Sequence, residues 1–166
     1  MSWNQGTSLT PDGEHRFVAD VGEQWSSLNG AHGGIVASLI VDATATVLRE
    51  QEVDPATTLR AATFGYVSGN EVGQSSIEVD IVRKGRSMIS THARVIQNGR
   101  ITTVARLHHS SPRHGQTFSD VARFAPKPDS AVRFVPTGAA HLDNVETHFL
   151  PDAMPFAGGD RAEYVA

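Results

Sequence analysis

Cysteine is absent from this 166-residue chain, which excludes disulfide bonds, thiolate nucleophiles and zinc sites built on cysteine. Runs of basic residues are absent as well. With 14 Lys and Arg against 18 Asp and Glu, the formal net charge is -4, so the chain lacks the cationic field that attracts phosphate backbones. We therefore predict no nucleic-acid partner.

The sequence also has no long hydrophobic run. Its longest apolar stretch, from Ile35 to Val41, is far too short to span a bilayer and is followed by Asp42. The first residues lack the basic start and apolar core of a signal peptide. These features predict a cytoplasmic protein with no membrane association, and the length suits one domain with a substantial core.

A glycine-rich loop that leads directly into an apolar segment is the most informative feature present. The loop carries Asn29, Gly30 and His32, and the apolar spacing that follows predicts a helix from about Gly33 to Glu50. This helix is apolar on almost every side, so we expect other structure to enclose it. Glycine lets a ligand approach closely, and the first N–H groups of a helix have no intrahelical partner. Such a start can bind an oxygen that carries negative charge.

Alternation of apolar and polar residues predicts strands on both sides of this helix. One strand precedes it and four follow, at His15–Val21, Thr58–Ser68, Ser75–Arg83, Met88–Gln97 and Ile101–His108. Asn98-Gly99 predicts a two-residue hairpin turn, because both positions tolerate positive φ. Together these elements predict an α+β fold, in which an antiparallel sheet packs its concave face on one long helix.

The character of the sequence changes after Ser110. Six of the eight prolines lie in residues 111–166, where few regular patterns occur. We therefore expect residues 1–110 to form a single domain and residues 111–166 to form a Pro-rich C-terminal extension, irregular or wrapping a neighbouring subunit, with room for a short strand. His108, His109 and His114 precede Asp120, but their spacing fits no recognised ligand pattern, so we predict no metal site.

Three motifs together resemble those of a known family. They are Asn29-Gly-Ala-His-Gly-Gly34 at the helix start, Val82-Arg-Lys-Gly-Arg-Ser87 at a strand turn, and Arg94-Val-Ile-Gln-Asn-Gly99. The chain resembles the hotdog-fold acyl-CoA thioesterase superfamily, in particular the first repeat of TesB-type, double-hotdog proteins, over roughly residues 13–110. The resemblance implies a hotdog fold, an antiparallel sheet wrapped around a long central helix.

The resemblance also implies roles for residues at the helix start. Gly33 or Gly34 would supply the N–H that polarises the thioester carbonyl, and His32 would help to position that carbonyl. Asn29 could hold the attacking water, and Asp42 would be the carboxylate that activates it or attacks directly. Each residue also has a plain structural alternative: close packing for the glycines, helix capping for His32, an ordinary loop position for Asn29, and a solvated or dimer-facing carboxylate for Asp42.

Residues of one turn and two strands complete the implied site. Arg83, Gly85, Arg86 and Ser87 form a turn, with Lys84, whose charges suit the phosphates of coenzyme A, although a solvated hairpin end is the alternative. Thr63 and Gln97 could line the acyl tunnel. The implied substrate is an acyl-CoA or acyl-carrier thioester, with coenzyme A as part of the substrate and no separate cofactor. A homodimer or homotetramer is expected, because pairing closes the sheet edge and the acyl channel.

Two departures from the family pattern keep alternatives open. Asp42 lies ten residues after His32, whereas single-domain relatives place the carboxylate nine after it, and one residue turns a helical side chain by about 100°. Double-hotdog relatives take their catalytic Asp, Thr and Gln from a second repeat, for which this chain is too short. A homodimer or a separate chain could complete the site. The alternatives are a non-catalytic acyl-binding subunit and a hotdog acyl-CoA hydratase or dehydratase.

Overall fold

The computed structural model describes residues 6–112, 115, 129–134, 139–151 and 164–165. Contacts divide the chain into two compact units, Met1–His114 and Gly115–Ala166. The first unit contains one long helix and eight strands: β1 (Thr7–Pro11), β2 (Arg16–Val21), β3 (Ser26–Ser27), β4 (Gly30–Ala31), α1 (Gly33–Glu50), β5 (Thr58–Tyr66), β6 (Gly73–Lys84), β7 (Ile89–Gln97) and β8 (Arg100–Ser110), with a short 3-10 helix at Glu23–Trp25 before β3.

Six of these strands form one antiparallel sheet in the order β1-β2-β6-β7-β8-β5. The β7–β8 hairpin turns at Asn98 and Gly99, whose φ angles of 53° and 72° confirm the predicted two-residue turn. A register shift follows Ile81 in β6, shortly before the turn into β7. Strands β1 and β5 are the two edges of this sheet.

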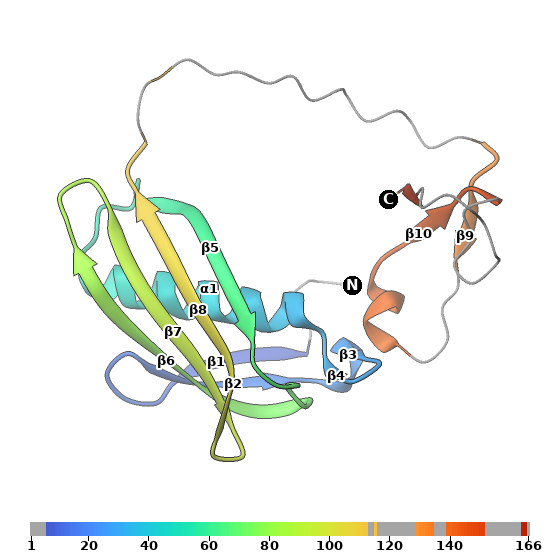
Figure 1. Cartoon of the computed structure of the whole chain (residues 1–166), viewed down its shortest axis with the longest axis horizontal. Helices are drawn as coiled ribbons and strands as arrows, with labels where there is room; N and C mark the ends of the chain where they lie inside the picture. Colours follow the sequence, from blue (N-terminus) through green and yellow to red (C-terminus); the bar gives the residue numbers. More distant parts are fainter. Residues whose placement is uncertain (1–5, 113–114, 116–128, 135–138, 152–163, 166) are drawn as a thin grey trace. The chain divides into compact units, whose positions relative to one another are not determined.

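The helix α1 crosses one face of the sheet (Figure 1) and packs on β2, β6 and β7. Its buried residues recur with helical spacing and form a single face: Ile35, Val36, Leu39, Ile40, Ala43, Thr44, Val47 and Leu48. The sheet contributes alternate residues to the same core, among them Phe17, Ile77, Val95 and Leu107. The bounds Gly33–Glu50 and the antiparallel sheet confirm the α+β prediction.

Within the single chain, other structure covers only one side of α1, so the predicted enclosure is not complete there. Gly34, Asp42 and Ala45 are exposed, and Ser38 and Val41 are only partly buried. These five positions share the side of the helix that does not face the sheet. Most of the residues at these five positions are small, and the chain itself does not cover them.

The second unit, described by itself, holds a small three-stranded sheet in the order β11-β10-β9. Its elements are β9 (Val132–Phe134), a 3-10 helix at Ala140–Asn144, β10 (Thr147–Phe149) and β11 (Tyr164–Val165). Phe134 and Phe149 meet edge to face with ring centroids 5.4 Å apart. An extension that wraps a neighbouring subunit stays a prediction, and His114 and Asp120 lie outside the described residues.

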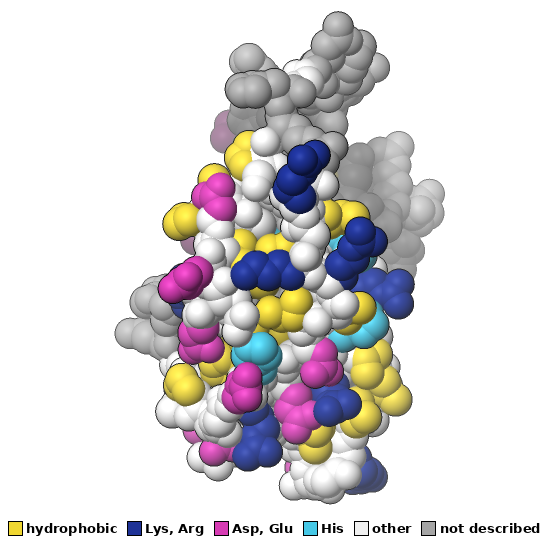
Figure 2. All heavy atoms as spheres, turned by 90° about the vertical axis from the view of Figure 1, so that its left-hand side faces the viewer, with side chains coloured by type: hydrophobic (Ala, Val, Ile, Leu, Met, Phe, Trp, Pro, Cys, Tyr) yellow, Lys and Arg dark blue, Asp and Glu magenta, His cyan; other side chains and the backbone are white. Residues whose placement is uncertain are grey.

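The face of the molecule drawn in Figure 2 carries charges of both signs. On the face drawn in Figure 2, acidic, basic and hydrophobic side chains are interspersed. Within the part of the chain that the structure describes, no helix is both long enough and apolar enough to cross a membrane.

Candidate active site at the start of the helix

The segment that leads into α1 is tied down on two sides. Strands β3 and β4 pair as a hairpin, with Leu28 and Asn29 as its two-residue loop. The N–H of His32 donates to the carbonyl of Trp25 at 2.8 Å, and the N–H of Ala31 donates to the carbonyl of Asn70 at 2.7 Å. Both hydrogen bonds lie immediately before the helix begins, so they fix the position of its first residues.

The first N–H groups of α1 are left open. Ile35 and Val36 donate back to the carbonyl of His32 at 3.0 and 3.3 Å, and the His32 side chain makes no capping hydrogen bond. Among the described residues, no protein acceptor faces the N–H groups of Gly33 and Gly34. Two free donors therefore stand at the positive end of the helix dipole, the arrangement that stabilises an oxyanion.

Both glycines have a side chain close to them. A Cβ on Gly33 would lie 3.1 Å from Cζ of Tyr66, and a Cβ on Gly34 would lie 2.9 Å from Cε1 of His32. The hydroxyl of Tyr66 donates to the carbonyl of Gly33 at 2.7 Å. Burial raises the pKa of Tyr66 above its ordinary value, so the hydroxyl keeps its proton at neutral pH and remains a donor.

An open pocket of about 380 Å³ lies against this helix start. It is lined by Asn29, Ala31, Gly33, Tyr66, Ser68, Gly69 and Asn70. The lining includes hydroxyl and amide side chains but no Asp, Glu or His. This pocket can therefore hold and polarise a carbonyl, whereas a general base has to come from outside its lining.

Asp42 lies away from this pocket. It is nine residues beyond Gly33, which places it about 14 Å further along the helix axis. Its side chain is exposed, on the uncovered side of α1. The other residues predicted for the chemistry are closer, because Asn29 lines the pocket and His32 is the N-cap residue whose ring lies over Gly34.

The predicted phosphate-binding turn, residues 83–87, lies at the opposite end of α1. The ammonium of Lys84 donates to the carbonyl of Gln51 at 2.8 Å, just past the C-terminus of the helix. An 18-residue helix is about 27 Å long, so this basic turn and Gly33 are separated by that length within one chain. Gly85 has a structural task, because a Cβ there would lie 2.9 Å from the carbonyl of Met88. Arg83 is paired with Ser90 near the end of β6, and Arg86 and Ser87 lie in the turn that follows.

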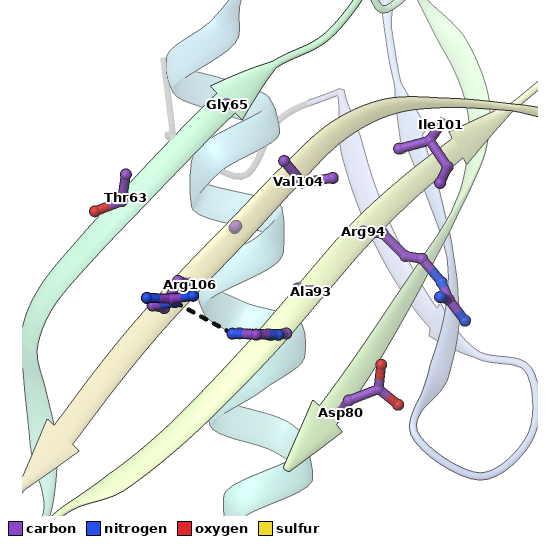
Figure 3. Close-up of a pocket in the computed structure, with 10 residues that line it drawn as sticks. Thr63, Gly65, Asp80, Ala93, Arg94, Ile101, Val104 and Arg106 are labelled. Atoms are coloured by element: carbon purple, nitrogen blue, oxygen red, sulfur yellow. Dashed lines mark hydrogen bonds between the residues drawn. The ribbon is translucent and has the colours of Figure 1, made fainter. Parts of the chain in front are cut away.

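Thr63 and Gln97 are not brought to the pocket. Thr63 pairs with Arg106 across β5 and β8 and lines a separate groove of about 540 Å³. Figure 3 shows this groove on the side of the sheet opposite α1, where Nε of Arg106 donates to His92 at 3.2 Å. Gln97 is buried and uses its amide to hold a loop: Oε1 accepts from the N–H of Glu71 at 2.8 Å, and Nε2 donates to the carbonyls of Glu71 and Gln74 at 3.1 Å.

Tyr66, Ser68 and Asn70 line the pocket but carry no signal in the sequence. Tyr66 reads as an ordinary strand residue, and the other two belong to a polar connection between strands. Their part in the site depends on β5 running back beside α1, which places its last residue at Gly33. Only the tertiary structure shows this.

Solved structures with the same fold share part of their length with this chain. A hot dog fold protein of unknown function from Alicyclobacillus acidocaldarius has a TM-score of 0.73 at 23% identity, covering 87% of this chain and 53% of that one. A putative thioesterase II from Thermobifida fusca has a TM-score of 0.67 at 17% identity, covering 90% and 55%. The BH2602 protein from Bacillus halodurans, solved with CoA, has a TM-score of 0.56 at 20% identity, covering 61% and 70%.

The chain thus spans about half the length of the first two of these proteins. No curated protein matches the sequence. The family model for the acyl-CoA thioesterase N-terminal domain matches residues 21–109, which is more than half of the chain and includes α1, the strands β5 to β7 and β8 up to its next-to-last residue. This chain belongs to the family of acyl-CoA thioesterase N-terminal domains and has the hotdog fold.

Proposed function

We propose that this protein binds an acyl-CoA thioester with its carbonyl at the start of α1 and hydrolyses it. The observation that supports this most directly is the pair of open N–H groups of Gly33 and Gly34 beside a pocket large enough for the thioester end of the substrate. Membership of the thioesterase family and the CoA held by the Bacillus halodurans neighbour point to the same ligand chemistry.

The proposed reaction places charge where the helix start stabilises it. Water attacks the thioester carbon, the carbonyl oxygen becomes an oxyanion, and the N–H groups of Gly33 and Gly34 donate to it. Asp42 takes the proton from the water, and that proton passes to the departing thiolate. The products are a carboxylic acid and free coenzyme A. His32 positions the carbonyl, and Asn29 holds the water.

Two residue groups need a second hotdog unit to reach this site. Asp42 is about 14 Å, and the basic turn about 27 Å, from Gly33 along the helix. Strand β5 is a sheet edge whose residues are exposed except for partly buried Phe64. This strand runs back along α1 and ends at Tyr66, bonded to Gly33. Antiparallel pairing of two β5 strands would set the basic turn of one copy at the same end as Gly33 of the other.

A homodimer joined along β5 therefore brings the basic turn of one copy to the helix start of the other. It also satisfies the free edge of the sheet and covers the small residues on the exposed side of α1. Arg83, Gly85, Arg86 and Ser87 of the second copy would then bind the phosphates of coenzyme A.

Release of free thiol from a panel of acyl-CoA esters tests the proposal. Asp42→Asn should lower kcat by about 100-fold or more, the usual contribution of a general base. Glu50→Gln provides the matched control, because Glu50 is an exposed carboxylate in the last turn of the same helix. Equal activity of the wild type and Asp42→Asn would remove Asp42 from the mechanism, and no turnover with any ester would refute hydrolysis.

Binding without hydrolysis is the second candidate function. It is favoured by the pocket itself, whose lining contains no Asp, Glu or His. Under this alternative the protein binds a non-hydrolysable acyl-CoA thioether in calorimetric titration but releases no thiol from the corresponding ester. An enoyl-CoA in the same panel, followed by loss of its conjugated absorbance, tests hydration.

A further inference from the structure

A buried asparagine lies directly beneath the loop that leads into α1. Asn70 belongs to the connection between β5 and β6 and is only 8% exposed. Its Nδ2 donates to Oγ1 of Thr103 at 2.9 Å, and its Oδ1 accepts from the hydroxyl of Thr102 at 2.5 Å. Both threonines are buried residues of β8. One donor and one acceptor therefore fix the orientation of the amide.

The backbone of Asn70 carries the loop. Its carbonyl accepts the N–H of Ala31 at 2.7 Å, two residues before Gly33. Gly30 adopts a φ of +118°, and a Cβ there would lie 2.2 Å from the Asn70 carbonyl oxygen. The loop thus rests on this oxygen with no room for a side chain, and the position of the oxygen is set by the bonds from Asn70 to β8.

We infer that Asn70 is a positioning residue, which holds the N–H groups of Gly33 and Gly34 in the position where they donate to the thioester oxygen. This inference rests on the proposed function. Asn70 acts through Ala31, since its side chain bonds to β8 and its carbonyl bonds to the loop. The reaction is sensitive to such support, because a displacement of about 1 Å in a catalytic group can cost 10²-fold in rate.

Thr103 offers a test that leaves the pocket lining unchanged. It is fully buried, it accepts the amide of Asn70, and it does not line the pocket. Thr103→Val keeps the shape and removes the acceptor, whereas Thr103→Ser keeps the hydroxyl. We expect Thr103→Val to lower kcat for an acyl-CoA about tenfold with KM changed less than about twofold, and Thr103→Ser to restore kcat. A variant that only lost folded protein would keep its kcat per folded molecule.

A second measurement decides the inference without turnover. Amide hydrogen exchange at Ala31 should be about tenfold faster in Thr103→Val than in Thr103→Ser, and the amide resonances of Gly33 and Gly34 should shift only in the valine variant. If the wild type hydrolyses no ester, the proposed function fails, and the Ala31 exchange rate still decides the role of Asn70.

Two results would overturn the role of Asn70. One is wild-type exchange at Ala31 in Thr103→Val, and the other is an equal loss of kcat in Thr103→Ser. If Thr103→Val does not fold, Thr102→Val against Thr102→Ser makes the same comparison from the other side of the amide, because the Thr102 hydroxyl donates to Asn70.

Discussion

The close approach of Gly30 to Asn70 predicts that the position of the helix start depends on a glycine at residue 30. Gly30 and Gly13 have nearly the same φ, +118° and +114°. A Cβ on Gly13 meets nothing within 4 Å, whereas a Cβ on Gly30 would lie 2.2 Å from the carbonyl oxygen of Asn70. Both Gly30→Ala and Gly13→Ala therefore force an alanine into a positive φ, and only Gly30→Ala adds this steric conflict.

The difference in stability between the two variants depends on the hydrogen bond that the steric conflict breaks. Forcing alanine into this φ region costs about 1–3 kcal/mol in either variant. In Gly30→Ala the loop must also move off the Asn70 oxygen, which breaks the bond from the Ala31 N–H and leaves a buried carbonyl unpaired, at a further cost of about 1–3 kcal/mol. Urea unfolding followed by tryptophan fluorescence, to which buried Trp25 contributes, measures both variants against the wild type.

Activity separates the two variants further. Gly13→Ala should retain the wild-type kcat, because Gly13 lies in the β1–β2 connection, whereas Gly30→Ala should lose most of its kcat with the displaced Gly33 and Gly34 donors. Equal losses of stability in the two variants would show that the loop yields freely at Asn70. The reasoning about a rigidly supported helix start would then be wrong.

Three further predictions concern other parts of the molecule. Burial lowers the pKa of His109 below 6.5, so the folded state binds fewer protons than the unfolded chain; the free energy of unfolding should fall as the pH drops below 6.5, and His109→Leu should lessen that fall in urea titrations at different pH. Ala62→Lys, in the middle of edge strand β5, should convert the proposed dimer to a monomer in light scattering, whereas Thr10→Lys on the opposite edge β1 should not. Arg83→Ala combined with Arg86→Ala should raise KM for acyl-CoA about tenfold but leave KM unchanged for an N-acetylcysteamine thioester, which has no phosphate.

Most of the fold could be predicted because its signals are local. The helix Gly33–Glu50 and the Asn98-Gly99 turn follow from residue spacing and from φ preferences, and both are confirmed. Strand β1 was not predicted, since Thr7–Pro11 holds one large apolar residue, Leu9, and ends in proline. The β3–β4 hairpin is only two residues long on each side and carries no alternation to detect.

The site could be predicted only as far as neighbours in the sequence are neighbours in space. Asn29, His32 and Gly33 form one short segment, and the structure keeps them together beside the pocket. The basic turn resembles a substrate-binding motif, but its distance from that segment depends on which end of α1 the β6–β7 turn meets. The role of Asn70 could not be predicted from the sequence either, because it depends on hydrogen bonds to β8 and to Ala31.

In the proposed dimer, the free edge of the sheet and the active site depend on the same strand, β5. Tyr66, the last residue of edge strand β5, bonds to Gly33 at the start of α1, so a second unit that pairs with β5 would lie next to the helix start. Association and catalysis should therefore be linked: a protein that completes its site by dimerising loses specific activity on dilution, with the same midpoint as its dissociation. A site complete within one chain would keep its specific activity at every concentration, because its reacting groups would never separate.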